Sequence, residues 1–289
     1  MNRFLELNEE LVKHQRKSTK PESLLKEKRK NKFSRPESVD DEFERYFQQA
    51  PVIPPNWCNI KADIIRIARA EEARWRNAAG NKILESNPAM LADLEKYWRV
   101  VIPAAQAHPN AVQSAADNNN FPWSAAFVSW VMSTAGVTKA MGFELSQRHM
   151  SYIVQALRNR EASDRTKPFW LYDHIELLRE AVPQPGDILC KNAVNDQNQI
   201  TTSWTHSRLR RDFFENGHDA IPIANAFGSS HCDIVVDTIQ RGARRFMRTV
   251  GGNVSDSVSF TEHEVDQNGT LVNPRAGLIF GIIKLVECP

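Results

Sequence analysis

The sequence lacks a long apolar run and a recognisable secretory signal. No stretch approaches the about 18 consecutive apolar residues that a membrane helix needs, and the longest candidates are short runs such as residues 276–286. Charged residues lie among the first ten positions, with neither an apolar core region nor a small-residue cleavage site after them. We therefore expect no transmembrane segment, and synthesis in the cytoplasm without a signal peptide.

Cysteine is scarce, and neither sign of charge dominates. The four cysteines (Cys58, Cys190, Cys232 and Cys288) are scattered without a C-x-x-C pair, which favours reduced thiols over a disulfide scaffold and gives no support to a zinc site. The 37 basic and 35 acidic residues leave a formal net charge of +2, so no overall field draws the protein onto nucleic acid. We expect no nucleic-acid partner, no metal and no cofactor.

The N-terminal residues differ in composition from the rest of the chain. Residues 13–35 are strongly basic, and an acidic cluster follows at residues 40–44. Such a segment buries little, which favours a charged arm over residues 1–48 that is partly helical or disordered. The alternative is a docking segment recognised by a partner. Prolines in residues 51–55 indicate an extended entry to one domain, which we place at residues 49–289.

From residue 60 onward the sequence reads as helices followed by strands. Apolar spacing, caps and proline breaks predict helices near residues 60–68, 91–98, 122–136, 151–158 and 171–181. Short apolar runs predict strands near residues 187–190, 233–236, 245–250, 258–260 and 278–286. Between the first two strands, residues 192–230 are expected to form a long loop region. Helices first and strands afterwards indicate an α+β fold with a mostly antiparallel sheet.

Three short segments carry residues suited to chemistry. Ser124 falls in the first turn of an expected helix, where free N–H groups can stabilise a developing oxyanion, and the small Ala125 leaves room for a substrate. His231 stands at the mouth of a buried strand, and Asn253 follows two glycines between two strands. Taken alone, each of the three segments is more simply interpreted as having a structural role. Together they supply a nucleophile, an imidazole base and an amide that can fix the tautomer of the imidazole.

The same segments resemble cell-wall hydrolases of the CHAP and NlpC kind. Those enzymes have the motif W-C-A-A-F-V-x-W at the helix that carries the nucleophile and P-G-D-[IL] at the first strand. The strand that carries the catalytic base has H-V-x-[IV]-V, and one phage-associated branch also has G-G-N. This chain has corresponding segments in the same order: Trp123–Trp130 with serine in place of cysteine, Pro185–Ile188, His231–Val235 and Gly251–Asn253. The resemblance runs from about residue 60 to the end, and is nearest to a bacterial and phage family related to CHAP.

The resemblance implies a papain-like fold with Ser124 as nucleophile, His231 as base and Asn253 as the residue that orients His231. It also implies an amidase or endopeptidase that cleaves an amide bond of peptidoglycan by acyl transfer. Such an enzyme would act as a phage lysis enzyme or a secreted antibacterial effector. Its expected partners are a peptidoglycan peptide or glycopeptide substrate, with an immunity protein or a secretion machine as a partner of the N-terminal arm. The place of action would be the periplasm or a target cell envelope.

Serine at position 124 departs from the usual cysteine and leaves three alternatives. A thiol is readily ionised beside an imidazole, whereas a serine hydroxyl must lose its proton to the base during attack. The chain is therefore a true serine hydrolase, a cysteine enzyme whose nucleophile has been replaced, or a papain-like module that binds a cell-wall peptide or a protein partner without cleaving it. We rank the serine hydrolase first.

Several further residues have weaker indications. Asp233 lies two positions after His231 on the same strand face and could support the imidazole instead of Asn253, although a structural carboxylate is the simpler interpretation. His149 begins a helix, where a substrate contact and a packing role are equally plausible. Trp123 and Gly252 flank the proposed catalytic positions as supporting residues. In the long loop, two histidines and three aromatic residues are more simply loop and core residues than metal ligands or a glycan groove: His206, His218, Trp204, Phe213 and Phe214.

Overall fold

The computed structural model describes residues 57–102, 122–173, 182–195, 197, 199–201, 203–215, 230–272 and 278–286. All of these belong to the compact unit Pro51–Pro289. The predicted arm at residues 1–48, the proline-rich entry, and His218 lie outside the described residues, and the domain boundary stays a prediction.

Helices dominate the first half of the described chain. They are α3 (Trp57–Arg74), α4 (Leu91–Val101), α6 (Ser124–Thr134) and α7 (His149–Glu161), with the short turns η1 (Pro88–Met90) and η2 (Lys139–Met141). The short α8 (His206–Arg210) and the π-helical η4 (Arg211–Glu215) come later, within the region predicted as a long loop. A side-chain cap begins η1, where Asn87 accepts a hydrogen bond from the Ala89 N–H at 3.0 Å and Pro88 stands at the first position. The helices α4, α6 and α7 begin without a side-chain cap. The four predicted helices before residue 160 are confirmed. None of the described helices is long and apolar enough to cross a membrane.

Six strands form one antiparallel sheet in the order β1-β6-β2-β3-β4-β5. The strands are β1 (Phe169–Tyr172), β2 (Ile188–Asn192), β3 (Ser230–Arg241), β4 (Arg244–Gly251), β5 (Ser259–Val265) and β6 (Ile279–Leu285). The five predicted strands are therefore confirmed, with longer bounds for most. The α+β class with N-terminal helices on an antiparallel sheet is also confirmed. The finer papain-like assignment stays a prediction.

The start of the predicted helix at residues 171–181 is wrong. Leu171 and Tyr172 belong to β1, where they pair with Ile283 and Ile282 of β6. A short apolar run does not distinguish a buried strand from a helix by periodicity, so pairing with β6 decides its structure. Residues 174–181 lie outside the described part of the chain.

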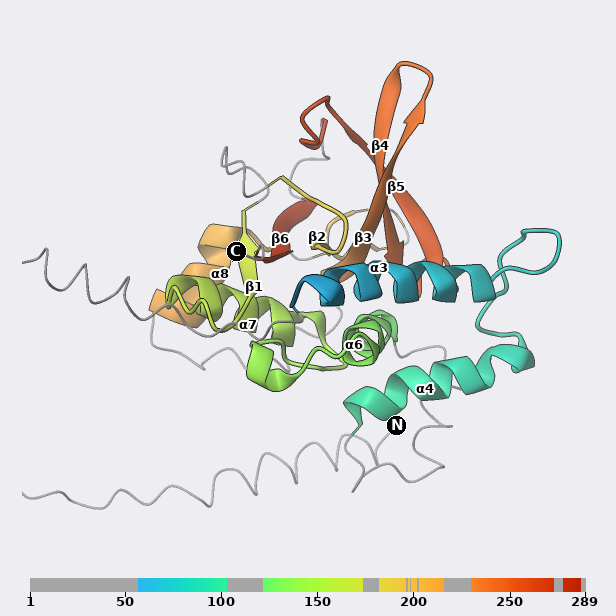
Figure 1. Ribbon diagram of the computed structural model, residues 1–289, viewed down its shortest axis with the longest axis horizontal. Coiled ribbons are helices and arrows are strands. Elements are labelled where there is room, and N and C mark those ends of the chain that lie inside the picture. The colour runs from blue at the N-terminus through green and yellow to red at the C-terminus, as the bar shows by residue number, and fades with distance from the viewer. Residues whose placement is uncertain are drawn as a thin grey trace, which may run out of the picture. The chain divides into compact units, whose positions relative to one another are not determined.

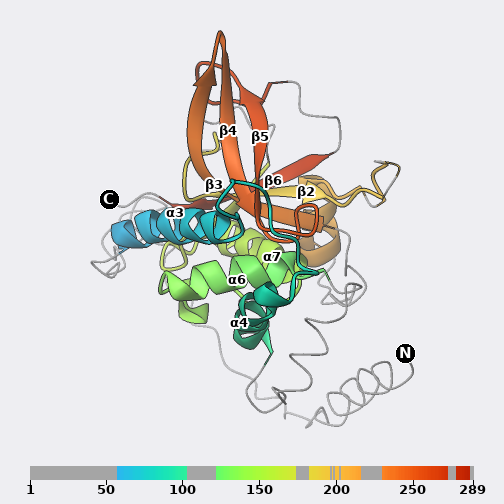
Figure 2. The ribbon, with the colours of Figure 1, turned by 90° about the vertical axis from the view of Figure 1, so that its right-hand side faces the viewer.

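The helices α3, α6 and α7 contact the sheet, and α4 packs on α6 (Figures 1 and 2). Alternate strand residues divide between two apolar clusters, as a period of two requires. Ile188, Cys190 and Ile234 join the large cluster shared with the helices, whereas Leu189 and Val235 join a smaller one. The sheet is thus covered by helices on one face, and the start of α6 lies against the strands that carry the predicted catalytic residues.

Stacked aromatic side chains fix the start of α6. The Trp123 ring lies 5.2 Å from the ring of Trp75 and 5.7 Å from that of Tyr97, and the Trp75 indole N–H donates to the Tyr97 hydroxyl at 2.9 Å. All three side chains are buried. Since each ring comes from a different segment, this stack joins α3 and α4 to the residue that precedes Ser124.

Asp187, in the segment that resembles P-G-D-[IL], joins several elements from a fully buried position. Its carboxylate lies 2.6 Å from the Lys284 ammonium of β6 and 3.5 Å from that of Lys61 in α3, and it accepts a hydrogen bond from the Gln184 N–H at 2.8 Å. The motif therefore has a structural role at the entry to β2.

We expect Asp187→Ala to lower the free energy of unfolding by roughly 3–5 kcal/mol, because it leaves the buried Lys284 ammonium without its counter-ion. Urea unfolding would measure the loss. Asp63→Ala is the control, since the exposed pair of Asp63 with Arg66 is worth at most about 1 kcal/mol. Equal losses from the two variants would contradict the role given to Asp187.

Candidate functional site

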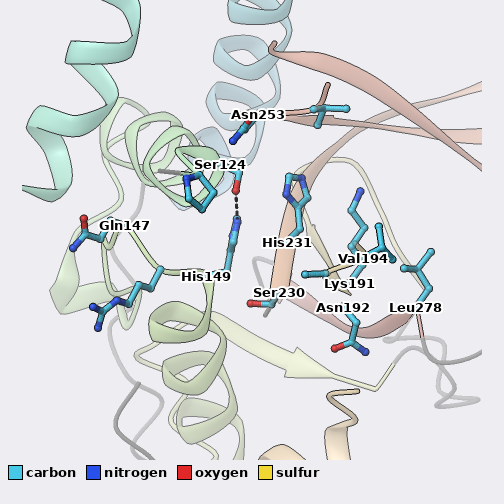
Figure 3. Close-up of a pocket in the computed structure, with 14 residues that line it drawn as sticks. Ser124, Gln147, His149, Lys191, Asn192, Val194, Ser230, His231, Asn253 and Leu278 are labelled. Atoms are coloured by element: carbon cyan, nitrogen blue, oxygen red, sulfur yellow. Dashed lines mark hydrogen bonds between the residues drawn. The ribbon is translucent and has the colours of Figure 1, made fainter. Parts of the chain in front are cut away.

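The predicted catalytic residues line one pocket of about 430 Å³ (Figure 3). Ser124 enters it from the start of α6, His149 from the start of α7, Lys191 from β2, His231 from β3 and Asn253 from the turn after β4. Five segments that are distant in sequence thus meet here. The volume falls in the range of small-ligand sites.

Ser124 is the first residue of α6 and is almost fully buried. The first intrahelical bond at this end runs from the Phe127 N–H to the Trp123 carbonyl at 2.9 Å. The amides before Phe127 therefore have no helical carbonyl to bond, and they carry the positive end of the helix dipole. This is the environment predicted for a nucleophile that generates an oxyanion.

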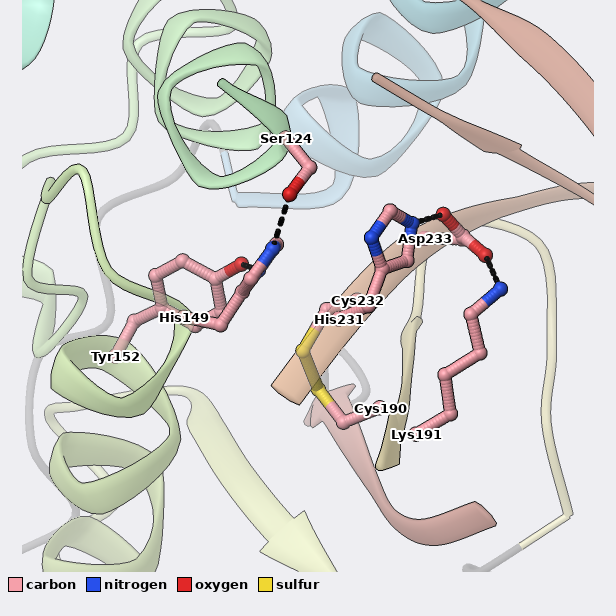
Figure 4. Close-up of a disulfide and its surroundings, with 8 residues drawn as sticks. All are labelled: Ser124, His149, Tyr152, Cys190, Lys191, His231, Cys232 and Asp233. Atoms are coloured by element: carbon pink, nitrogen blue, oxygen red, sulfur yellow. Dashed lines mark hydrogen bonds and ion pairs between the residues drawn. A yellow bond between two sulfur atoms is a disulfide. The ribbon is translucent and has the colours of Figure 1, made fainter. Parts of the chain in front are cut away.

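The hydroxyl of Ser124 is hydrogen-bonded to His149, with 2.6 Å between Oγ and Nε2. The other ring nitrogen of His149, Nδ1, contacts the hydroxyl of Tyr152 (Figure 4). Burial lowers the pKa of His149 well below its usual range; the charges of His231 and Lys191 lower it further, and that of Asp233 opposes them. Burial also raises the pKa of Tyr152 well above its usual range. Both side chains are therefore neutral near pH 7.

His231 belongs to a separate charged group. Its Nε2 lies 2.7 Å from Oδ1 of Asp233, and Oδ2 of that carboxylate lies 2.8 Å from the Lys191 ammonium. Asp233 is fully buried. Although burial alone would raise the pKa of Asp233, the charges and hydrogen bonds of Lys191 and His231 bring it well below its usual range. Asp233 is thus an ionised carboxylate that holds His231 by one ring nitrogen.

The geometry redistributes the roles predicted for the two histidines. The expected neighbour of Ser124 was His231, but the hydrogen bond goes to His149, and the two imidazole rings lie 5.4 Å apart. Figure 4 shows the free ring nitrogen of His231, Nδ1, on the side of Ser124 and His149. The residue that orients His231 is Asp233 rather than Asn253. Asn253 lines the pocket near the serine instead.

Glycine is required at both positions before Asn253, because neighbouring side chains leave no room for a Cβ atom there. A Cβ on Gly251 would lie 1.8 Å from Oδ1 of Asp233, and one on Gly252 would lie 2.5 Å from Cβ of Phe127 in α6. Asn253 itself has a left-handed backbone, with φ of 56°, and such conformations in residues other than glycine concentrate at functional sites. The Gly-Gly-Asn segment thus lets β4 end against both Asp233 and α6.

The prediction of reduced thiols is wrong for Cys190 and Cys232, which form a disulfide. They face each other across β2 and β3, with their Cα atoms 4.2 Å apart, and both are fully buried. Residues 42 positions apart in sequence become direct neighbours only through strand register. Cys232 points away from the pocket, as alternation with His231 requires. The side chains of Cys58 and Cys288 lie outside the described residues.

The remaining predicted residues are mostly structural. Trp123 is buried in the aromatic stack and contacts Glu85 through its indole N–H, while Ala125 is buried in the core. Trp204 and Phe213 are buried and lie 5.9 Å apart, so they anchor the loop to the core. His206 begins α8. Among the described residues, no group of three or more histidine, cysteine, aspartate or glutamate side chains is placed to hold a metal ion.

The sequence interpretation missed Tyr152 and Lys191. Tyr152 lies one helical turn after His149, at the i+3 spacing that brings two side chains together on a helix. Lys191 pairs with His231 in the register of β2 and β3. The contact of Tyr152 with His149 could have been predicted from their spacing in the sequence, whereas the position of Lys191 depends on the register of β2 against β3.

We expect replacement of both Cys190 and Cys232 by alanine to lower the free energy of unfolding by about 4 kcal/mol, the loop-closure value for this sequence separation. Urea unfolding with and without reductant would measure it. Reductant should destabilise the wild type and leave the double variant unchanged. Four free thiols in unreduced, denatured protein would contradict the disulfide.

Stability should fall on acidification because two histidines, the buried His149 and the half-buried His263, are held in neutral form. Burial lowers the pKa of His263 to about 4, whereas an unfolded histidine titrates near 6.5. Between these values the unfolded chain binds the extra proton, so stability is lost as the pH falls. From pH 7 to pH 5, His263 alone should account for about 2 kcal/mol, and His149 adds a loss of the same sign. Urea unfolding at both pH values should show a smaller difference for His263→Gln, and an unchanged difference would contradict this account.

The comparisons with known proteins identify one family. The family described as "Uncharacterized protein conserved in bacteria (DUF2272)" matches residues 75–281, well over half of the chain. No curated protein and no solved structure matches. The matched range contains every residue that lines the pocket. The chain therefore belongs to the DUF2272 family.

Proposed function

We propose that the protein is a serine hydrolase that cleaves an amide bond of peptidoglycan through an acyl-enzyme on Ser124. The observation that carries the proposal is the meeting, in one pocket, of a serine at a helix start and a histidine held by an ionised carboxylate. This combination supplies a nucleophile, an oxyanion site and a base with a fixed ring. The papain-like fold and the kinship with CHAP and NlpC hydrolases are part of this proposal.

In the proposed reaction, Ser124 Oγ attacks the amide carbon while its proton passes to Nδ1 of His231. The amides at the start of α6 hold the negative oxygen. When this intermediate collapses, the C–N bond breaks and the amine departs with the proton from His231. The acyl group remains on Ser124 as an ester. Water then attacks the ester, and His231 receives the proton of the water and returns one to Ser124 Oγ. Asp233 keeps the ring of His231 oriented and stabilises its cationic form.

The choice of substrate rests on the resemblance and is supported by two observations. The pocket has room for a short peptide segment, and its lining combines cationic and polar groups with apolar side chains such as Val194 and Leu278. The buried disulfide suits a protein that acts in an oxidising compartment such as the periplasm. A cell-wall peptide fits the size and lining of the pocket, and it is found in such a compartment.

Digestion of purified peptidoglycan, followed by mass analysis of the fragments, tests the proposal. We expect the wild type to release fragments that identify the bond, Ser124→Ala to lose activity by about 10⁴-fold or more, and His231→Ala to lose about 10²–10⁴-fold. Ser133→Ala, at the far end of the same helix, is the matched control and should keep full activity.

Two outcomes would contradict this function. Undiminished digestion by Ser124→Ala would exclude the serine as nucleophile. Intact peptidoglycan with both the wild type and Ser124→Cys would instead favour a module that binds without cleaving, and a binding assay with the same fragments would then show retention.

A further inference from the structure

The hydrogen bonds around His149 allow only one arrangement of protons that satisfies every buried group. The neutral imidazole carries one proton, on Nδ1 or on Nε2. With the proton on Nδ1, the ring would donate to Tyr152, and the tyrosine's own O–H would need another acceptor. Within the described part of the chain, that hydroxyl has no acceptor other than His149, and Tyr152 is fully buried. A buried donor without a partner costs about 1–3 kcal/mol.

The opposite arrangement gives both Tyr152 and His149 an acceptor. Tyr152 donates its O–H to Nδ1 of His149, and the Nε2–H of His149 donates to Oγ of Ser124. The hydroxyl proton of Ser124 then points to the pocket, where His231 Nδ1, water or substrate can accept it (Figure 4). The direction of donation then runs from Tyr152 through His149 to Ser124.

We propose that His149 is a further catalytic residue of this site: a neutral imidazole whose Nε2–H donates to Ser124 Oγ, with Tyr152 as the residue that fixes its tautomer. This inference rests on the proposed acyl transfer at Ser124. It separates the two histidines by role. His231 moves protons, whereas His149 keeps its proton and stabilises negative charge on the serine oxygen.

The surroundings of His149 keep it neutral and therefore able to do this. Tyr152 faces it from its own helix, His231 and Asp233 from β3, and Lys191 from β2. Burial disfavours the imidazolium, and the charges of His231 and Lys191 disfavour it further. A cationic His149 would also donate at both nitrogens, which would force the buried Tyr152 to become an acceptor.

The donated hydrogen bond acts twice in the reaction. During attack, His231 removes the hydroxyl proton while His149 stabilises the alkoxide character that Oγ acquires. During deacylation, the bond between Oγ and the acyl carbon breaks, and the electron pair returns to Oγ. His149 stabilises that charge until His231 returns a proton. No proton leaves His149 in either step, so protons balance through His231 alone.

The tautomer can be tested without any variant. Long-range ¹H–¹⁵N correlation spectra of the wild type near pH 7 distinguish the two ring nitrogens of His149. We expect the proton on Nε2 and the lone pair on Nδ1. A proton on Nδ1 would overturn the inference.

The catalytic role can be tested with a fluorophosphonate, which forms a P–Oγ bond with an activated serine and releases fluoride. Intact mass gives the rate of labelling. We expect His149→Ala to slow the labelling of Ser124 by about 10²–10³-fold, as expected for loss of one preorganised donor. His149→Gln can still donate from its amide and should recover part of the rate. Tyr152→Phe should slow labelling less and raise the share of the Nδ1–H tautomer. Tyr172→Phe, at a buried tyrosine of β1 that does not line the pocket, is the control and should label at the wild-type rate.

The outcomes separate this inference from the proposed function. Rapid labelling of the wild type that is lost in Ser124→Ala but unchanged in both His149 variants would overturn the role of His149 and leave the hydrolase proposal standing. A wild type that is not labelled at Ser124 would overturn both.

Discussion

The burial of one negative charge, that of Asp233, is the constraint on which this site depends. A carboxylate with no exposed surface requires a counter-charge and hydrogen-bond donors; the Lys191 ammonium lies 2.8 Å from Oδ2, and Nε2 of His231 lies 2.7 Å from Oδ1. The same carboxylate excludes a side chain at position 251, where only glycine fits beside Oδ1. It therefore sets the ring orientation of His231 and the course of the turn that carries Asn253.

The two histidines at Ser124 differ because their neighbours differ in charge. His231 is hydrogen-bonded to the ionised carboxylate of Asp233, whereas His149 is buried beside neutral Tyr152, and its surroundings lower its pKa well below the usual range. Two imidazoles 5.4 Å apart would repel if both were charged. Their contrasting surroundings remove this conflict, so one ring can exchange protons while the other remains neutral.

Much of the fold was predictable because its signals are local. Apolar spacing and helix breaks gave α4, α6 and α7, and short apolar runs gave the five strands from β2 to β6. The Ser124 helix start, the His231 strand and the position of Asn253 in one pocket were likewise predicted. The predictions that failed concern features that depend on strand register and on the packing of distant segments. The disulfide required the pairing of Cys190 with Cys232, and the Ser124–His149 bond required the relative placement of two helix starts. Strand alternation did place Asp233 beside His231, but it could not rank it above Asn253.

The disulfide and the charged group occupy neighbouring rungs of the same ladder. Cys190 pairs with Cys232, and the next rung pairs Lys191 with His231. Side chains alternate between the faces, so the covalent bond holds the two strands from the helix side while Lys191 and Asp233 meet on the other. A slip of β2 against β3 by one residue would turn Lys191 away from Asp233 and leave the buried carboxylate without the ammonium that neutralises it. The cross-link forbids that slip, and in this way a buried disulfide outside the pocket preserves the pairing of Asp233 with Lys191 and the orientation of His231.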